Sequence, residues 1–382
     1  MEYFLNELQT TVRDLARTIA EEKVLPVRAE LDEKEEFPAE IMKEIAASGL
    51  FGIAIPEELG GIGGGAFELC LATEQLARIC GGVAVSYAAN FLGADILIDN
   101  GSEEQKARFL PDIASGLKMC AFAITEESAG SDAAAVQTTA VKTDNGYLLN
   151  GCKRFITNGG DAELYTVIVR TSNGKGARGL SAIIVEKGTS GFTFGRKEKK
   201  MGIRASSTRE LLFDDCLVPF ENLIGKEGMG FFYAMKLFEK SRPGIGAQAV
   251  GIAQGAFEAA MDHARNRVQF GEPVFNFQAV QHMLANMAMD IEAARALIYA
   301  SARTIDSGLQ KSGNLESAMS KVYASDVAMR VATDAVQIMG GVGYMRDYPA
   351  EKYMRDAKIT QLYEGTNQVL RNIVASELRK QY

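Results

Sequence analysis

The spacing of apolar residues changes twice along the chain, and each change predicts a different kind of structure. Near the N-terminus apolar side chains recur every three or four residues: Phe4, Leu5, Leu8, Val12, Leu15 and Ile19. This spacing predicts a helix that packs on one face. Similar patterns predict helices over 38–50, over 67–97 with an interruption at Gly81-Gly82, and over 103–115. The charge-rich segment 28–36 is predicted to be a solvent-exposed connection, and the glycine run 60–65 a turn.

The middle third has short runs of β-branched and apolar residues in place of helical stripes. Residues 147–150 follow an Asp144-Asn145-Gly146 turn, which is a strong signal for a β-hairpin. Further runs lie between glycine-containing turns, at 165–169, 181–185 and 211–213. These features predict a β-domain from about residue 121 to about residue 225. Its basic run, 196–200, is interpreted as a solvated face.

The helical spacing returns after Phe231. One stripe consists of Phe277, Val280, Leu284, Met287, Ile291, Ala294 and Ile298, and another of Val322, Val327, Val331, Ala335 and Met339. A third, between residues 245 and 268, is rich in Ala and Gly and therefore suited to close helix packing. Three long apolar helices with few breaks predict an antiparallel bundle. The order is therefore helical, β and helical, an α+β multidomain chain.

Length and composition restrict the class of protein. A chain of 382 residues is too long for one small core, so two or three domains are expected. The 49 acidic and 41 basic residues give a net charge of −8, which argues against a nucleic-acid binder. Five separated cysteines are typical of reduced thiols, and two isolated histidines are too few for a metal cluster. No apolar run approaches the roughly 18 residues that a membrane span needs.

Glu364 is the most unusual charged residue of the chain. It is the only charge between Lys358 and Arg371, and Gly365 follows it directly. If its surroundings are dry, burial raises its proton affinity and makes it a base for a weakly acidic C–H bond. The alternative is a solvated surface carboxylate at a helix break, since most carboxylates are exposed. The local sequence leaves both interpretations open.

Two other segments carry groups suited to a polar ligand. Residues 121–132 (AFAITEESAGSD) enter the predicted β-domain with small side chains, hydroxyls and backbone N–H groups that can hydrogen-bond a heterocycle. Residues 337–344 (QIMGGVGY) end a long predicted helix in glycines, which allow a pyrophosphate or an adenine to approach the backbone. Each segment has an ordinary alternative, as a domain linker or a helix C-terminus.

Together with residues 363–366 (YEGT), these segments resemble the acyl-CoA dehydrogenase family in order and spacing. Residues 155–160, 201–208 and 267–271 are similar to further blocks of that family, so the resemblance covers the whole chain. It implies an N-terminal α-helical domain (1–118), a middle β-barrel domain (119–226) and a C-terminal four-helix bundle (227–382). It also implies bound FAD, acyl-CoA substrates as in short- and medium-chain enzymes of the butyryl-CoA dehydrogenase type, and a homotetramer or dimer of dimers.

The resemblance implies roles for individual residues. Glu364 is expected to be the catalytic base; one branch of the family takes its base from the position of Ser241, which here holds no carboxylate. The residues expected to bind FAD are Phe122, Ile124, Thr125, Gly130, Ser131, Phe155, Thr157, Arg267, Gln269, Phe270, Gln278, Gln337, Gly340, Gly341, Thr366 and Gln368. Of these, the group from Arg267 to Gly341 is expected to hold the ADP half across a subunit interface. The residues expected to contact the acyl-CoA are Ser131, Glu239, Arg242, Tyr363, Glu364 and Gly365.

The implied reaction is the α,β-dehydrogenation of an acyl-CoA thioester to a trans-2-enoyl-CoA. Glu364 is expected to take the α-proton while the β-hydrogen leaves as hydride to flavin N5. Hydrogen bonds to the thioester carbonyl, from the Glu364 N–H and a ribityl hydroxyl, are expected to stabilise the developing enolate. An electron-transfer flavoprotein is the implied redox partner, fatty acid β-oxidation the implied process and the cytoplasm the expected location.

The chain departs from the family pattern at several positions. Glu127 stands where many members have Pro, and Phe155 replaces a common Trp. The stretch 80–90 has no Arg to meet a distal carboxylate, which argues against glutaryl-CoA and favours an uncharged short, branched or cyclic acyl group. Two alternatives stay open. One is an enoyl-CoA reductase that runs the reverse reaction with electron-transferring flavoproteins, and the other is a non-catalytic relative that binds FAD and CoA.

Overall fold

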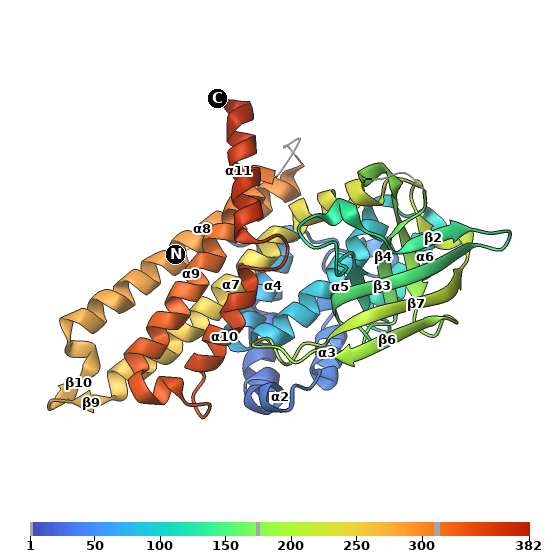
Figure 1. Cartoon of the computed structure of the whole chain (residues 1–382). Coiled ribbons are helices and arrows are strands. Elements are labelled where there is room, and N and C mark those ends of the chain that lie inside the picture. Colours follow the sequence, from blue (N-terminus) through green and yellow to red (C-terminus); the bar gives the residue numbers. More distant parts are fainter. Residues whose placement is uncertain (1–2, 173–175, 309–313) are drawn as a thin grey trace.

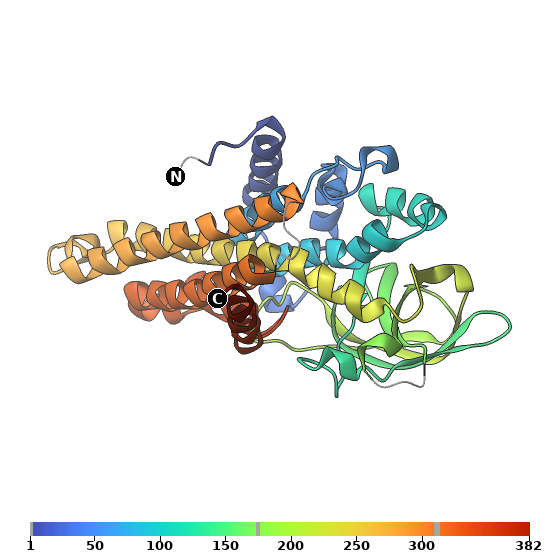
Figure 2. The same ribbon diagram turned by 90° about the horizontal axis from the view of Figure 1, so that it is seen from above.

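The computed structural model describes residues 3–172, 176–308 and 314–382. Helices form both ends of the chain and a curved β-sheet forms its middle (Figure 1). Seen from above, the long C-terminal helices lie side by side at one end of the molecule and the sheet lies at the other (Figure 2). The N-terminal helices contact both, through α4 with the bundle and α5 with the sheet. The predicted order of helical, β and helical parts is confirmed.

Six α-helices make up the described N-terminal part. They are α1 (Glu7–Ile19), α2 (Arg28–Lys34), α3 (Ala39–Ala47), α4 (Ala66–Ile79), α5 (Gly81–Asn100) and α6 (Glu103–Ala114), and α1 continues into a π-helical turn (Ala20–Val24). The interruption predicted at Gly81-Gly82 lies one residue earlier: Cys80 is extended, with φ −151°, and both glycines belong to α5. By length and composition α5 could cross a membrane, but 83% of its most apolar window is buried inside this protein.

The prediction of a solvent-exposed connection over 28–36 is wrong. The segment forms α2, in which Leu31 and Asp32 are buried. The Asp32 carboxylate accepts two hydrogen bonds from the Arg355 guanidinium, at 2.6 Å and 3.2 Å. A buried charge is tolerated when it is paired in this way. The sequence spacing did not reveal the helix because one of its buried positions carries a charge whose partner lies more than 300 residues away.

The middle part is an eight-stranded sheet with the order β6-β7-β3-β2-β4-β5-β8, and β1 pairs in parallel with β4. The strands are β1 (Cys120–Ala123), β2 (Thr139–Lys142), β3 (Tyr147–Thr157), β4 (Leu164–Arg170), β5 (Leu180–Glu186), β6 (Phe192–Lys197), β7 (Thr208–Val218) and β8 (Leu223–Ile224). The predicted hairpin joins β2 to β3 in antiparallel register, and its turn is closed by a 2.8 Å bond from Thr143 N–H to the Gly146 carbonyl.

The basic run 196–200 is only partly a solvated face. Arg196 and Lys199 are exposed, but Lys197 and Lys200 are half-buried. Lys197 donates to the Glu35 carbonyl, and Lys200 Nζ donates to the Ser206 carbonyl at 2.6 Å. Burial lowers the pKa of Lys200 to about 8. Lys197 therefore ties the end of β6 to the end of α2, whereas Lys200 bonds within the loop between β6 and β7.

The C-terminal part is built on three long helices, α7 (Gly230–Asn266), α8 (Gln278–Ser307) and α9 (Asn314–Met339). The short strands β9 (Val268–Gln269) and β10 (Glu272–Pro273) join α7 to α8, and α10 (Ala350–Thr360) and α11 (Asn367–Gln381) complete the part. The Gly-rich stripe of α7 packs on α4: a Cβ at Gly251 would lie 2.3 Å from the Glu74 carbonyl oxygen, and one at Gly255 2.1 Å from that of Arg78. Close helix contact thus requires glycine at these positions.

Candidate active site

The loop between α10 and α11 carries Glu364 in a left-handed backbone conformation. Its φ is +56°, and the φ of Gly365 is +91°. Such a φ is uncommon for a residue other than glycine and costs about 1–3 kcal/mol. At Gly365 a Cβ would also lie 2.9 Å from the Leu370 side chain, so this position requires glycine. The two residues reverse the chain sharply and turn the Glu364 side chain toward α7.

Contacts with α9 hold this loop in place. Lys321 Nζ donates to the Gly365 carbonyl at 2.8 Å and to Asn367 Oδ1 at 3.1 Å. Asn367 in turn donates to Ser325 Oγ and to Asp326 Oδ1, each at 2.9 Å. Because Lys321, Ser325 and Asn367 are all buried, these bonds are shielded from water. The sequence analysis did not identify Lys321 or Ser325.

A second set of contacts holds the loop from the side of α7. The Tyr363 hydroxyl donates to Gln248 Oε1, and Gln248 Nε2 donates to the Gly81 carbonyl at 3.0 Å. Gln248 is buried. The chain of bonds therefore connects the Glu364 loop to the start of α5.

Glu364 lies in a largely desolvated position among polar groups. The Ser241 hydroxyl of α7 donates to Glu364 Oε2 at 2.8 Å. Burial raises the pKa of the Glu364 carboxyl, while the Ser241 hydrogen bond and the charges of Arg242 and Lys321 oppose that rise. The Glu364 side chain is thus half-buried and hydrogen-bonded within the protein, and is not a fully solvated carboxylate.

Arg242 is a buried cation beside Glu364. Its Nη1 donates to Asn314 Oδ1 at 3.2 Å, but among the described residues its Nε has no hydrogen-bond partner. Burial lowers its pKa, and the nearby Glu364 and Glu239 carboxylates oppose that effect. Burial also raises the pKa of the half-buried Glu239. An orphaned guanidinium N–H in such a place suits an anionic or polar ligand.

The predicted flavin segment runs from β1 into an exposed loop. Phe122 packs edge-on against Phe238 of α7, with 5.9 Å between ring centroids. Ile124 is buried and Thr125 half-buried, whereas Gly130 and Ser131 are exposed. A Cβ at Gly130 would meet nothing within 4 Å. The segment therefore offers open backbone to a ligand.

A buried ion pair, which the sequence did not reveal, holds the loop that follows β1. Glu126 Oε1 accepts from Lys153 Nζ at 2.7 Å and from Thr138 N–H at 3.0 Å, and Glu126 Oε2 accepts from Gln137 N–H at 2.6 Å. Lys153 also donates to the Ile124 carbonyl at 3.2 Å. Glu126 lies in the segment 121–132, but nothing in the sequence pairs it with Lys153, so only their proximity in the fold reveals the ion pair.

The end of β3 carries the second predicted flavin segment. Phe155 has φ +57° and is 62% exposed, an unusual state for a large apolar side chain. Thr157 is half-buried. The next residue, Asn158, donates from Nδ2 to the Ser86 carbonyl of α5 at 2.8 Å, which fixes the strand end against the N-terminal helices.

The remaining predicted FAD residues lie in two places. Thr366 caps α11 by accepting from Val369 N–H at 3.3 Å, and Gln368 is exposed beside it. The others gather around the tip of the bundle, at the opposite end of the molecule from the sheet (Figures 1 and 2): Arg267, Gln269, Phe270, Gln278, Gln337, Gly340 and Gly341. Phe270 is 96% exposed, and a Cβ at either glycine would meet nothing within 4 Å. One copy of the chain does not bring the two groups of predicted flavin residues together.

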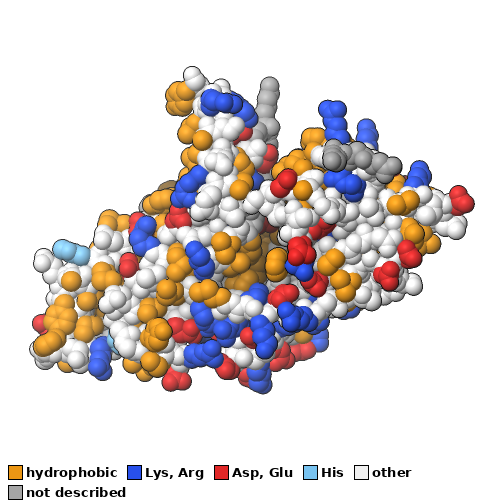
Figure 3. Space-filling view, in the orientation of Figure 1, with side chains coloured by type: hydrophobic (Ala, Val, Ile, Leu, Met, Phe, Trp, Pro, Cys, Tyr) orange, Lys and Arg blue, Asp and Glu red, His pale blue; other side chains and the backbone are white. Residues whose placement is uncertain are grey.

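A cavity of about 190 Å³ lies between α4, α5 and α7, and Ser241 forms part of its wall. Its lining includes Val85, Ala88 and Ala89, from the stretch 80–90 that the sequence analysis relates to the acyl group. It also includes three charged residues that the sequence analysis did not identify, Asp95, Lys240 and Asp306. The molecular surface is hollowed between the bundle and the sheet, where hydrophobic side chains are visible (Figure 3).

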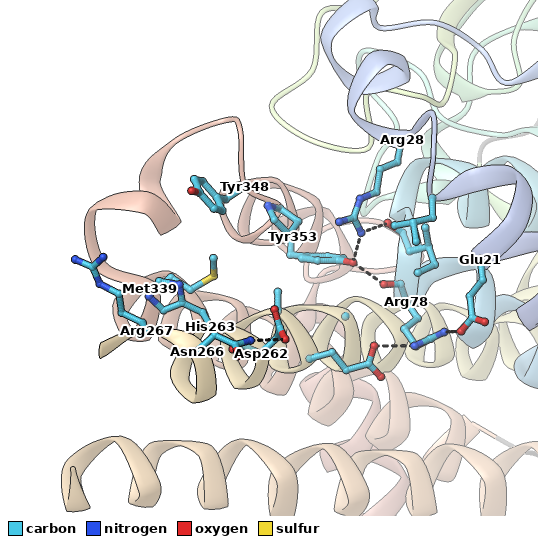
Figure 4. Close-up of a pocket in the computed structure, with 16 residues that line it drawn as sticks. Glu21, Arg28, Arg78, Asp262, His263, Asn266, Arg267, Met339, Tyr348 and Tyr353 are labelled. Carbon is cyan, nitrogen blue, oxygen red and sulfur yellow. Dashed lines mark hydrogen bonds and ion pairs between the residues drawn. The ribbon is translucent and has the colours of Figure 1, made fainter. Parts of the chain in front are cut away.

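A larger cavity, about 720 Å³, lies elsewhere, between the C-terminal half of α7, α10 and the N-terminal helices (Figure 4). Its charged groups bind one another: Arg28 donates to the Tyr353 hydroxyl at 2.8 Å, and Arg78 to Glu258 at 2.7 Å. Arg267 is the one predicted site residue in its described lining. Size alone therefore does not locate a reactive centre.

Comparison with known proteins gives the family. The profiles of the acyl-CoA dehydrogenase N-terminal, middle and C-terminal domains match residues 6–117, 121–216 and 228–378. The chain belongs to the acyl-CoA dehydrogenase family. An acryloyl-CoA reductase (NADH) of Anaerotignum propionicum is 45% identical over 382 residues, which cover 100% of this chain and 96% of the relative.

Two solved structures superpose closely on this chain. Butyryl-CoA dehydrogenase of Megasphaera elsdenii is 44% identical, with a TM-score of 0.96 over 99% of this chain and 100% of that one. A chain from a structure described as the electron transferring flavoprotein of Acidaminococcus fermentans is 47% identical, with a TM-score of 0.96 over 99% of both chains. Acyl-CoA dehydrogenases thus share the whole architecture described above.

Proposed function

We propose that this acyl-CoA dehydrogenase removes the α-proton of a short acyl-CoA thioester with Glu364 and forms the trans-2-enoyl-CoA. The observation that carries the proposal is the position of Glu364. Its carboxylate is half-buried and accepts from Ser241, which also lines a cavity large enough for a short acyl chain, and the orphaned Arg242 N–H lies next to Ser241 on α7. A surface carboxylate would need none of these features.

The chain's own groups account for the proton step. Burial raises the pKa of Glu364, which brings its basicity closer to that needed at neutral pH. Its backbone N–H has no hydrogen-bond acceptor among the described residues, so it is available to the thioester carbonyl. A donor placed there stabilises the negative charge that develops on that oxygen as the α-proton leaves. Ser241 orients the carboxylate through its 2.8 Å hydrogen bond.

The residues present fit FAD. Phe122, Ile124, Thr125, Gly130, Ser131, Phe155 and Thr157 would hold its ring half, with Thr366 and Gln368. The exposed group Arg267, Gln269, Phe270, Gln278, Gln337, Gly340 and Gly341 would hold the ADP half of FAD on another copy. The open backbone at Gly130, Gly340 and Gly341 and the exposed Phe155 and Phe270 rings support this assignment. When bound, FAD supplies the acceptor for the hydride that leaves the β-carbon.

The substrate and partners follow from the same arrangement. The residues that would contact the acyl-CoA are Ser131, Glu239, Arg242, Tyr363 and Gly365. The buried Arg242 suits a polar part of the CoA moiety.

Because one copy separates the two groups of flavin residues, we infer a homotetramer built from dimers. The structure of the A. fermentans electron transferring flavoprotein supports an electron-transfer flavoprotein as redox partner. We place the enzyme in the cytoplasm, in fatty acid β-oxidation, with domains 1–118, 119–226 and 227–382.

The reverse reaction is the second candidate. The similarity to the acryloyl-CoA reductase of A. propionicum supports an enoyl-CoA reductase that works with electron-transferring flavoproteins. Glu364 would then return a proton to the α-carbon. The same residues serve both directions, and the redox partner determines which one proceeds.

Anaerobic mixing of the purified protein with butyryl-CoA, hexanoyl-CoA and isobutyryl-CoA, monitored by flavin absorbance, tests the function. We expect at least one thioester to bleach the flavin and yield an enoyl-CoA. Glu364→Gln is expected to keep the flavin but to slow bleaching by about 100- to 10,000-fold, which is the typical contribution of a positioned base. Near-full activity in this variant would disprove the role of Glu364. Turnover of crotonyl-CoA with a reduced electron-transferring flavoprotein, without the forward reaction, would favour the reductase.

A further inference from the structure

The cavity beside Ser241 has a polar feature that a plain hydrocarbon tail does not need. Most of its lining is apolar or small, including Leu69, Val85, Phe91 and Ile245. At about 30 Å³ for each water-sized group, its volume of about 190 Å³ accommodates roughly six such groups. Under the proposed function, on which this inference rests, the distal end of a short acyl chain enters this space.

Two of its three charged residues already have partners. Lys240 Nζ donates to both carboxylate oxygens of Asp99, each at 3.1 Å. Asp306 accepts from Ala66 N–H at 2.7 Å and from Phe67 N–H at 2.9 Å, so it satisfies the first backbone donors of α4. Their hydrogen-bonding capacity is thus directed toward the protein.

Asp95 differs from both. It lies on α5 between apolar neighbours and is half-buried in the cavity wall. Among the described residues, no hydrogen bond or ion pair within contact distance reaches its carboxylate; Lys240 and Asp99 act on it only through their charges. A desolvated carboxylate without a hydrogen bond is costly, and it gains most from a donor brought by a ligand.

We propose that Asp95 selects acyl groups that carry a hydrogen-bond donor, an ammonium or a hydroxyl, at their distal end. The donor would lie against the Asp95 carboxylate while the reacting carbons lie beside Glu364. The cavity lining contains two carboxylates and one ammonium, and that ammonium is already paired with Asp99. The same surplus of negative charge disfavours a dicarboxylic acyl group, whose distal carboxylate would meet Asp95 and Asp306.

Titration of Asp95 is consistent with this selection. Burial raises the pKa of Asp95 to about 6, an effect that Lys240 opposes and Asp99 strengthens. A raised carboxyl pKa means that the anion predominates above pH 6 and is lost below it. The preference for an ammonium group is therefore expected at pH 7.5 and is expected to weaken toward pH 5.

Four thioesters of matched length test the proposal: hexanoyl-CoA, 5-hydroxypentanoyl-CoA, 5-aminopentanoyl-CoA and glutaryl-CoA. Their Kd values are measured by calorimetry at pH 7.5 on the purified Glu364→Gln protein, in which turnover is expected to be strongly slowed. We expect the hydroxy and amino compounds to bind roughly 10- to 100-fold more tightly than hexanoyl-CoA, as a hydrogen bond to a charged group allows. Glutaryl-CoA is expected to bind most weakly.

The double variant Glu364→Gln/Asp95→Leu is expected to erase this preference, with the donor-bearing thioesters falling to the affinity of hexanoyl-CoA. The isosteric Asp95→Asn change, made in the same background, is the control for folding. It is expected to abolish the preference for the amino compound and to retain part of that for the hydroxy compound. Equal binding of all four thioesters, or a preference that survives Asp95→Leu, overturns the inference but leaves the proposed function standing. Binding of none of the four overturns both.

Discussion

The two ends of the C-terminal bundle present their predicted site residues in opposite ways. At the end near the sheet, the Glu364 loop is held by its own chain, through Lys321, Asn367 and Gln248. At the far end, Phe270 is 96% exposed, and Gly340 and Gly341 face open space. The first end is complete in a single copy, whereas the second end makes few contacts with its own chain.

This difference has a physical explanation. A catalytic carboxylate must be desolvated and oriented before substrate arrives, and a buried hydrogen-bond network provides that order. A ring such as Phe270, exposed to water on nearly all sides, gains stability only when a ligand or another protein covers it. We therefore expect the far end to complete the flavin site of a second copy.

The double variant Arg267→Ala/Phe270→Ala alters the far end and is expected to have the largest effect of the changes considered. Removing a cation and a large apolar surface from the far end is expected to weaken flavin retention by about 100-fold and to reduce the assembled mass. Flavin content per chain and light scattering measure both quantities. Arg265→Ala, an exposed arginine two residues away, is the matched control. A double variant with the flavin content and mass of the parent protein would contradict the expectation.

Mixed assemblies sharpen the same test. Glu364→Gln disables the near end of one copy, and Arg267→Ala disables the far end of another. Random pairing makes about half of the dimers mixed. In each mixed dimer, one of the two sites combines the intact near end of one copy with the intact far end of the other. Co-expression is therefore expected to restore about a quarter of the parent activity, although each variant alone has little. No recovery, despite demonstrated mixed dimers, would show that one copy builds the entire site.

Lys321→Met tests how the near end is held and is expected to lower kcat about tenfold. The variant removes the bonds to the Gly365 carbonyl and Asn367 and deletes a charge that lowers the pKa of Glu364. Without this cation the pKa of Glu364 rises, so its active anion forms only at higher pH. The acidic limb of the kcat profile is expected to move upward in pH.

The control for this charge effect lies on the same helix. Arg330 of α9 is half exposed and pairs with Asp290 of α8. Arg330→Gln is expected to leave the acidic limb in place. A purely structural role of Lys321 would lower the rate without moving the pH limb, and that outcome would refute the electrostatic part of the argument.

The sequence predicted the order of the parts and most helices because apolar spacing directly reflects burial. It failed at α2, where the buried Asp32 is stabilised by Arg355, and at Lys197 and Lys200, whose apolar stems are half-buried. The groups that pair with Asp32 and Lys197 lie 323 and 162 residues away, whereas Ser206, the partner of Lys200, lies six residues away. Local spacing carries no information about the two distant partners.

Some residues of the candidate site could be predicted from the sequence and others could not. Glu364 stood out through its neutral surroundings, and the structure adds the hydroxyl of Ser241 and the cation of Lys321 beside it. Asp95 could not be identified, because a single acid on an apolar helix has the same pattern whether it faces solvent or a cavity. The Lys153–Glu126 pair was hidden for a similar reason, since its members lie on a strand and a loop 27 residues apart.

Tyr363→Phe is expected to have the smallest effect of these variants, and to affect only the end of the bundle near the sheet. It removes one hydrogen bond, from the Tyr363 hydroxyl to Gln248, and leaves the ring in place. A buried hydrogen bond contributes about 1 kcal/mol, so we expect kcat/KM to fall about fivefold while flavin content and assembled mass, which depend on the far end, stay the same. Tyr382→Phe, at a fully exposed tyrosine, is the matched control and is expected to change none of these quantities. Loss of flavin in Tyr363→Phe would instead mean that the near end also determines cofactor binding, because the loop and the flavin contacts would then depend on the same hydrogen bond.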